Sequence, residues 1–427
     1  MEPISKRPKT ELRHPNKNGD LVNLSWSPDG SKILAGDYSD GALQVWDVAT
    51  GNQLTKIEVG TGQVTFQYFY PTPDWKRAYA SSAKRKWTPF EKDGKTWGRL
   101  EGNGKVRSWD LASGQVIETF QHSPPRHISV MKLSPSGHYF ITRDELPGEY
   151  ERYPKYVRSL WHAATKSCQT LPDAAKHEIV FSPDDKSMAV EFGDGEFATG
   201  FKLLELPSMR EIWSISTPSE LTTTDVRTFS PDGRYMLGSF HSWPSKGDAY
   251  RNWDTAVSRH ILWDTASGRE IWTFMSEKGH STSRFTFSPD GRRLVAIGGK
   301  ASQREMQFID VATGRVTQTT LLEKCTTMWY PEFSPDGQWV AIASRMIPPD
   351  IRESAVPEDV PQPRLNLIEA ATGIVRETLV LPPGFTLSAR FSPDGKTLAT
   401  VGRGRVYIWD MTTPPGELRE STNAQAR

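Results

Sequence analysis

A short phrase recurs along nearly the whole chain, and a repeat of this kind constrains the fold more than any other feature. Its opening half is Ser-Pro-Asp-Gly after an apolar residue, and its closing half is an apolar residue followed by Asp or Glu, often before Thr-Gly. The openings, some of them altered copies, begin at Ser27, Thr72, Ser134, Ser182, Ser230, Ser288, Ser334 and Ser392. The closings are Trp46-Asp47, Trp109-Asp110, Trp161-His162, Leu204-Glu205, Trp263-Asp264, Ile309-Asp310, Ile368-Glu369 and Trp409-Asp410. Openings and closings alternate strictly, so the chain is an array of eight similar units.

Each unit is predicted to contain four short strands. Ser-Pro-Asp-Gly is typical of a type I turn, because Pro fixes φ at the second position and Asp and Gly suit the third and fourth. Apolar and polar residues alternate before this turn, as at Val22, Leu24 and Trp26, and a strand-like run such as 32–36 follows it. A third strand ends at each closing pair, and a fourth follows Thr-Gly, as at 269–274. The pattern predicts an all-β propeller of four-stranded antiparallel blades, with eight blades, or seven if one altered unit forms none.

A repeat array of this length is expected to be one domain, because each unit buries its apolar face only against its neighbours. We expect the propeller at residues 8–412, a disordered tail at 1–7 and a flexible tail at 413–427. The 52 Lys and Arg residues balance 51 Asp and Glu residues, so no net field attracts nucleic acid or an anionic membrane. Any such binding would have to be local.

Cysteine usage and the first residues suggest a compartment. Two isolated cysteines, Cys168 and Cys325, argue against a disulfide framework and against a Cys-rich metal site. The start of the chain lacks the apolar segment of a secretion signal, and no run of about 18 apolar residues occurs. We therefore expect a cytoplasmic protein without a cofactor, a metal or a membrane association.

The turns and closings resemble the WD40 repeat family in the form with Ser-Pro-Asp-Gly turns and Trp-Asp-x-Ala-Thr-Gly closures. The resemblance covers roughly residues 8–412, is specific for the fold and says little about function. It implies a buried hydrogen-bond tetrad in each regular blade. The Gly-His element of the family is complete only at Gly279-His280, with partial copies at His14 and His122. Because 161–162 and 204–205 lack the Trp-Asp pair, we expect their blades to lack the tetrad.

Two segments compete for the last strand of the final blade. Residues 9–14 resemble the fourth strand at 117–122, while Pro414-Pro415 discourages a strand from continuing past Asp410. The rival is the segment 417–420, which would leave the N-terminus free. We favour the N-terminal segment, since pairing the first segment with the last removes an open sheet edge.

Long insertions all fall between the second and third strands of a unit. The distance from the fourth turn residue to the closing residue is 16 from Gly30 to Trp46 and 14 from Gly395 to Trp409. Four units exceed this: 34 from Trp75 to Trp109, 24 from Gly137 to Trp161, 30 from Gly233 to Trp263 and 31 from Gly337 to Ile368. Insertions gathered at one kind of connection often mark the binding side of a repeat protein.

Three of these insertions are rich in aromatic and basic residues, which protein-binding hot spots favour. The candidate partner-binding residues are Lys84, Arg85, Trp87, Trp97, Arg99, Tyr150, Tyr153, Tyr156, Trp243, Tyr250 and Trp253. The structural alternative is that the insertions fold back and bury these aromatics themselves. Single-stranded nucleic acid is a minor alternative for the basic and aromatic stretch 84–107. The insertion at 344–364 is not basic, which argues against the binding of nucleic acid.

Catalytic motifs are absent from the sequence: there is no Gly-x-Ser-x-Gly, no His-Glu-x-x-His and no phosphate-binding glycine loop. The recurring pairs are expected to be structural, with Trp in blade packing and Asp at strand ends. They are Trp46, Asp47, Trp109, Asp110, Trp263, Asp264, Trp409 and Asp410. We expect a non-catalytic scaffold for a protein or peptide partner, which would suit a subunit of a larger complex. The alternative is a propeller enzyme or small-molecule binder that uses a central funnel.

Overall fold

A computed structural model describes most of the chain as β-strands and tight turns. The described residues are 8–13, 21–37, 41–59, 69–82, 86–92, 95–101, 104–123, 127–145, 156–171, 178–193, 198–217, 222–242, 257–276, 284–300, 303–322, 327–328, 330–345, 363–381, 385–402 and 404–412. They divide into two compact units. The N-terminal unit is Leu12–Lys176 with Arg403–Arg405, and the C-terminal unit is Met1–Glu11, His177–Gly402 and Val406–Arg427.

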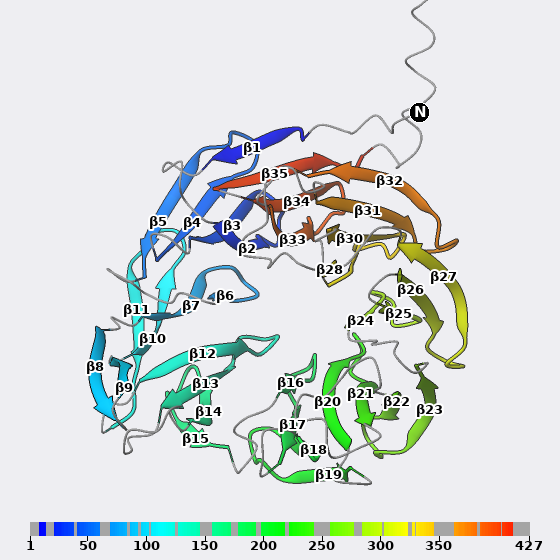
Figure 1. The fold of residues 1–427 in the computed structure, drawn as a ribbon. Helices are drawn as coiled ribbons and strands as arrows, with labels where there is room; N and C mark the ends of the chain where they lie inside the picture. Colours follow the sequence, from blue (N-terminus) through cyan, green and yellow to red (C-terminus); the bar gives the residue numbers. More distant parts are fainter. Residues whose placement is uncertain are drawn as a thin grey trace, which may run out of the picture. The chain divides into compact units, whose positions relative to one another are not determined.

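The N-terminal unit contains three four-stranded antiparallel sheets, which we number blades 1 to 3 (Figure 1). Blade 1 is β2 (Leu21–Trp26), β3 (Lys32–Asp37), β4 (Ala42–Asp47) and β5 (Gln53–Glu58). Blade 2 is β6 (Phe69–Pro71), β7 (Arg77–Ser82), β10 (Lys105–Asp110) and β11 (Val116–Phe120). Blade 3 is β12 (Ile128–Leu133), β13 (Tyr139–Glu145), β14 (Tyr156–His162) and β15 (Cys168–Thr170). A separate two-stranded sheet, β8 (Lys86–Lys92) and β9 (Lys95–Glu101), lies between β7 and β10 in the chain.

The C-terminal unit contains blades 4 to 8, built in the same strand order. Blade 4 is β16 (Ile179–Phe181), β17 (Ser187–Phe192), β18 (Gly200–Glu205) and β19 (Glu211–Ser216). Blade 5 is β20 (Thr222–Phe229), β21 (Tyr235–Ser242), β22 (Val257–Asp264) and β23 (Glu270–Met275). Blade 6 is β24 (Arg284–Phe287), β25 (Arg293–Lys300), β26 (Gln303–Asp310) and β27 (Val316–Leu322). Blade 7 is β28 (Thr327–Met328), β29 (Glu332–Phe333), β30 (Trp339–Arg345), β31 (Arg364–Glu369) and β32 (Val375–Val380), with β28 and β29 both paired to β30. The last three strands in the chain, of blade 8, are β33 (Phe385–Phe391), β34 (Thr397–Gly402) and β35 (Arg405–Asp410).

The fourth strand of blade 8 comes from the other end of the chain. Strand β1 (Thr10–Arg13) pairs with β35, and the backbone N–H of Lys9 donates to the carbonyl of Ile408 at 2.7 Å (Figure 1). The prediction that the N-terminal segment completes the last blade is therefore confirmed. The fold is an all-β eight-bladed propeller of four-stranded antiparallel sheets, so the prediction of eight blades is also confirmed.

The Ser-Pro-Asp-Gly turns form as predicted, and their side chains stabilise them. In blade 1 the N–H of Gly30 donates to the carbonyl of Ser27 at 2.9 Å, and Gly30 has a φ of 70°. The Ser27 hydroxyl donates to Asp29 Oδ1 at 2.5 Å and accepts the N–H of Lys32 at 2.9 Å. The hydrogen bond from Ser27 lowers the pKa of Asp29 to about 2. The position of Gly30 demands a positive φ, which glycine adopts without a Cβ clash.

Hydrophobic clusters join neighbouring blades within each unit. One cluster combines Leu34 and Leu43 of blade 1 with Ala80 and Trp109 of blade 2. In the C-terminal unit, another combines residues of blade 5 with residues of blade 6. Neighbouring sheets of one unit therefore pack on each other, as expected for repeats that cannot bury an apolar face alone.

Blade 3 contains a buried hydrogen-bond network that we had not expected. The indole N–H of Trp161 donates to Thr142 Oγ1 at 2.9 Å, and that hydroxyl donates to Asp144 Oδ1 at 2.6 Å. Asp144 also binds Ser159 and His122. The prediction that this blade lacks the tetrad is wrong, because Trp161 suffices as a donor whatever residue follows it. Leu204 of blade 4 is the equivalent of Trp161, since it lies opposite Met188 as Trp161 lies opposite Phe140. The side chain of Leu204 is apolar and has no N–H to donate.

Candidate functional site

The long insertions occupy the connections that the sequence indicated. Each joins the second and third strands of its blade: β7 to β10, β13 to β14, β21 to β22 and β30 to β31. Within each unit these connections therefore leave the sheets at the same end. The Ser-Pro-Asp-Gly turns and the closing turns lie at the opposite end, since strand direction alternates in an antiparallel blade.

The eleven candidate partner-binding residues are described to different extents. Seven of them, Lys84, Arg85, Tyr150, Tyr153, Trp243, Tyr250 and Trp253, lie outside the described residues. The backbone of three others is placed in the β8–β9 hairpin: Trp87 in β8, and Trp97 and Arg99 in β9. The register puts Trp87 opposite Leu100, and Trp97 opposite Phe90. The insertion, which the sequence suggested to be a loop, thus contains a hairpin, and Asp-Gly at 93–94 is a favoured two-residue connection between paired strands.

Tyr156, the remaining candidate, begins β14 and is half-buried. The guanidinium of Arg143, on the neighbouring strand β13, lies 3.4 Å from the centroid of its ring. A cation this close to an aromatic face is held by the ring quadrupole. One face of Tyr156 is therefore occupied by the chain itself.

The recurring Trp and Asp residues have structural contacts. Trp46, Trp109 and Trp409 are each only 1% exposed, and Trp263 is 3% exposed. Asp47 accepts the N–H and the hydroxyl of Thr50, both at 2.8 Å, and this closes the turn between the third and fourth strands. The same turn is closed by Asp110 with Ser113 and by Asp264 with Ser267, whereas Asp410, at the end of the last strand, accepts the N–H of Thr412 two residues on. The hydrogen bonds lower the pKa of Asp47, Asp110 and Asp264, so these carboxylates are poor proton acceptors.

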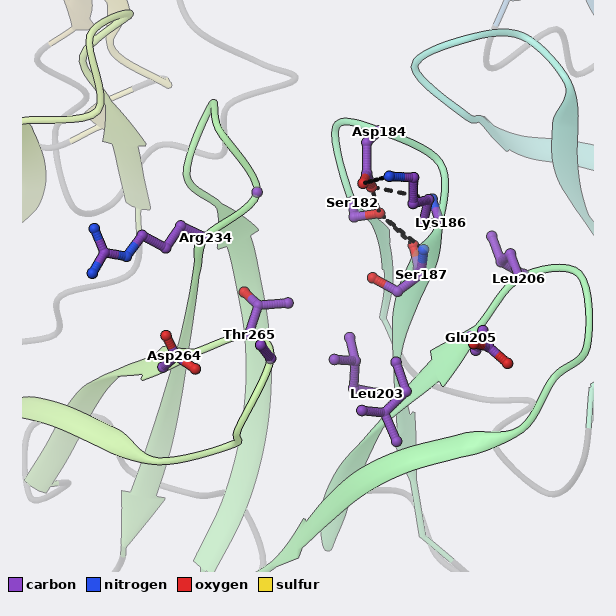
Figure 2. A pocket seen from close by; sticks show the side chains of 13 residues that line it. Ser182, Asp184, Lys186, Ser187, Leu203, Glu205, Leu206, Arg234, Asp264 and Thr265 are labelled. Carbon is purple, nitrogen blue, oxygen red and sulfur yellow. Dashed lines mark hydrogen bonds and ion pairs between the residues drawn. The ribbon is translucent and has the colours of Figure 1, made fainter.

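A pocket of about 430 Å³ lies between blades 4 and 5, at the end opposite to the long insertions (Figure 2). Its walls come from the altered turn at Ser182–Ser187, from the end of β18 and from the turns around Arg234 and Asp264. Leu203, Leu206 and Ile212 supply apolar lining. Our reading of the sequence did not identify this pocket, since its residues belong to turns with obvious structural roles.

Two carboxylates of the pocket, Asp184 and Glu205, already accept hydrogen bonds from neighbouring groups. Asp184 accepts the hydroxyl of Ser182 at 2.7 Å and the N–H of Lys186 at 3.1 Å (Figure 2). Glu205 accepts hydrogen bonds from Arg210 at 2.9 and 3.1 Å, and these bonds lower its pKa. Carboxylates held in this way stabilise turns and lack the raised pKa of a general base at neutral pH.

Blade 5 contains a carboxylate, an imidazole and a hydroxyl in a row. Asp225 Oδ2 lies 2.9 Å from Nε2 of His241, and Nδ1 of His241 lies 2.7 Å from the hydroxyl of Ser258. His241 and Ser258 are each 1% exposed. A nucleophilic serine must meet its substrate, and this hydroxyl is enclosed by the sheet. The arrangement is therefore part of the core of blade 5.

The interface between blades 4 and 5 also holds a buried carboxyl group. Glu191 of β17 is 2% exposed and accepts the N–H of Glu178 at 2.9 Å and the N–H of Val226 in β20. Burial raises the pKa of Glu191 to about 8, although the two backbone donors act in the opposite direction. A similar bond joins blades 2 and 3, where the hydroxyl of Ser81 in β7 accepts the N–H of Val130 in β12 at 2.6 Å. Glu191 therefore acts as a link between blades.

Neither a metal-binding cluster nor a membrane-spanning helix is found in the described ranges. No group of three or more His, Cys, Asp or Glu side chains there could hold a metal ion. No helix of those ranges is long and apolar enough to span a membrane.

Known proteins resemble this chain in sequence over short stretches and in fold over nearly all of it. The model of the family "WD domain, G-beta repeat" matches residues 7–47 and 384–410. Hydrazine synthase subunit beta of Kuenenia stuttgartiensis is 30% identical over 149 residues, which are 32% of this chain and 38% of that subunit. The chain thus spans well under half the length of that curated relative.

Solved structures extend the likeness of the fold. The C-terminal WD40 domain of Sif2 is 10% identical with a TM-score of 0.64, and the match covers 96% of this chain and 99% of that domain. The dihydro-heme d1 dehydrogenase NirN, solved in complex with DHE, is 13% identical with a TM-score of 0.55, and the match covers 88% of this chain and 69% of NirN. At these identities the likeness concerns the fold alone. The chain therefore has the fold of a WD40 β-propeller, and its first and last repeats match the WD40 family model.

Proposed function

We propose that this propeller is a non-catalytic scaffold that docks a partner protein or peptide on the insertions between second and third strands. The observation that carries the proposal is the β8–β9 hairpin. The insertion of blade 2 forms a sheet of its own, and its described strands pair with no blade strand. An insertion with regular structure and with Trp87, Trp97 and Arg99 is suited to contact a partner.

The named relative agrees with such a role. Hydrazine synthase subunit beta is by its name one subunit of an enzyme. WD40 propellers commonly serve as interaction scaffolds, so a place in a larger assembly is consistent with the fold. We further propose a cytoplasmic location, because two isolated cysteines suit a reducing compartment.

A non-catalytic role is supported by the chemistry of the described residues. The carboxylates in the pocket between blades 4 and 5 are held by Ser182, Arg210 and Ser267, and Ser258 is enclosed. An enzyme or a small-molecule binder, the second candidate class, would present a reactive group to solvent with a perturbed pKa.

Affinity capture with the intact chain and with a variant of four tryptophans tests the proposal. The variant replaces Trp87, Trp97, Trp243 and Trp253 with Ala. We expect the intact chain to retain a partner that the variant loses, while the thermal unfolding of the two stays similar. A matched control replaces four exposed apolar residues of outer strands with Ala, namely Leu54, Val116, Met275 and Leu321. Loss of the partner in the control, or collapse of the fold in the four-tryptophan variant, would contradict the proposal.

A further inference from the structure

The two faces of the β8–β9 hairpin carry different chemistry. Residues opposite each other in a strand pair share a face, and residues two apart along a strand do so as well. The pairs Lys86 with Glu101, Thr88 with Arg99, Phe90 with Trp97 and Lys92 with Lys95 therefore belong to one face. That face, which we call the cationic face, has four basic residues and one acidic residue around an aromatic pair.

The opposite face has almost no charge. It consists of the pairs Trp87 with Leu100, Pro89 with Gly98 and Glu91 with Thr96. Its single charged residue is Glu91. The alternation along both strands thus separates the basic residues from the mainly apolar ones, and only the cationic face is complementary to an acidic partner.

The hairpin also has strand edges on which another strand can be added. Among the strands that the structure describes, β8 and β9 pair only with each other, so each has one edge without a described partner strand. Pro89 interrupts the series of N–H donors in β8, and proline is a common device against strand addition. Strand β9, with the sequence KTWGRLE, contains no proline. Every residue of β9 therefore has the backbone N–H and the carbonyl that pairing with a third strand needs.

We propose that an extended acidic segment of a partner protein adds to β9 as a third strand. The segment would carry an acidic, an apolar and an acidic residue at alternate positions, in register with Lys95, Trp97 and Arg99. Backbone hydrogen bonds to the edge supply affinity in this mode of recognition, and alternate side chains supply specificity. A two-stranded hairpin is marginally stable in water, so a third strand would stabilise it as well. This inference rests on the proposed scaffold function and names the chemistry of its partner.

The spacing favours a peptide over single-stranded nucleic acid. The three residues of β9 repeat every second position, a spacing of about 7 Å that matches an extended peptide. A nucleic acid strand makes no use of an open backbone edge, and it is bound by a succession of stacking aromatics. The cationic face has one aromatic pair, Phe90 with Trp97.

Fluorescence anisotropy with the full-length chain tests the proposal. The probe is a labelled peptide, Thr-Glu-Thr-Phe-Thr-Glu-Thr, compared with the same peptide carrying Lys in place of both Glu residues. We expect the acidic probe to bind at least tenfold more tightly, and binding to weaken when backbone N-methylation blocks its donors. Equal binding of the two peptides would overturn the proposal. So would tighter binding of a labelled oligothymidylate of similar length.

Variants of β9 locate the site. Lys95→Glu combined with Arg99→Glu should weaken binding of the acidic probe at least tenfold and favour the Lys peptide. The matched control is Thr96→Glu, which adds a negative charge to the same strand on the opposite face, and it should change the affinity less than threefold. An equal loss in both variants would overturn the assignment to the cationic face. The comparison of the two peptides on the unmodified chain tests the proposal even where a variant fails to fold.

The two proposals fail in different ways. If the acidic probe does not bind but the four-tryptophan variant loses its captured partner, the scaffold proposal stands and the acidic-segment inference is wrong. If the captured partner is retained by the four-tryptophan variant, the scaffold proposal is wrong whatever the probe does.

Discussion

In blade 3, Nε2 of His122 lies 2.8 Å from a carboxylate oxygen of Asp144, and the side chain of Asp144 is completely buried. Thr142 and Ser159 donate hydrogen bonds to the same carboxylate. Three partners from three segments thus converge on one residue. A buried carboxylate with this number of donors specifies the packing of the blade, because every donor is left without an acceptor when the carboxylate is removed.

Replacing Asp144 with Ala should therefore destabilise the protein by about 3 kcal/mol, the scale of several buried donors left unsatisfied. Urea unfolding monitored by tryptophan fluorescence measures this loss. The control is Asp110→Ala, which removes the exposed turn bonds to Ser113 and should cost much less. If the two variants lost similar free energies of unfolding, the buried bonds of Asp144 would stabilise the protein no more than the exposed bonds of Asp110.

The N-terminal strand should contribute strongly to the stability of blade 8. Leu12 of β1 is 0% exposed, so Leu12→Ala should cost about 3 kcal/mol through lost burial and the cavity left behind. Differential scanning calorimetry of the full chain measures the shift in the melting temperature. Lys9→Ala is the control, because Lys9 is 63% exposed and lies 3.8 Å from Asp410. An unchanged melting temperature for Leu12→Ala would contradict the role of β1.

Glycine should be more stable than alanine at position 209 in blade 4. Met209 has a φ of 58°, and its N–H donates to the carbonyl of Glu205 at 2.8 Å, as Gly51 does to Asp47 in blade 1. A side chain at positive φ is unfavourable, so Met209→Gly should be more stable than Met209→Ala by about 1 kcal/mol. Chemical denaturation of the two variants compares them directly, since both lose the Met side chain. Greater stability of the Ala variant would contradict the assignment of strain to this position.

Stability should fall with rising pH because of Glu191. Burial raises the pKa of Glu191 to about 8, against about 4.5 for an exposed glutamate, and the nearby Asp225 and Glu178 act in the same direction. Between these values the folded state binds more protons than the unfolded state, so the free energy of unfolding decreases as the pH rises. The decrease should end above about pH 8. Each unit of pKa difference corresponds to about 1.4 kcal/mol.

Urea unfolding of the full chain at several pH values from 5 to 9 measures this dependence. In Glu191→Gln the pH slope should be reduced, although the variant loses an acceptor for one backbone N–H at every pH. Glu270→Gln is the control, because Glu270 is 42% exposed and pairs with Arg259 on the surface. A slope in Glu191→Gln as steep as in the unmodified chain would assign the dependence to other groups.

The positions of the insertions were predicted from the sequence, and their structure was predicted only in part. The sequence indicated the insertions between second and third strands, because their lengths can be counted between repeated turns. It did not indicate the hairpin of residues 86–101, since aromatic and basic residues in an insertion suggested a loop. The network around Asp144 was also missed, because His122 and Asp144 lie 22 residues apart in the chain.

The eight units, their four strands and the turns that join them could be predicted from the sequence alone. These features depend on local preferences: Pro and Gly fix a turn over four residues, and alternation over five or six residues defines a strand. Which side chains meet between strands and between blades could be learned from the three-dimensional structure and not from the repeats. The contact of Arg143 with Tyr156, the burial of Glu191 and the pocket beside Asp184 all depend on register and on neighbouring blades. A repeated phrase cannot encode such contacts, because each arises from the residues in which neighbouring repeats differ.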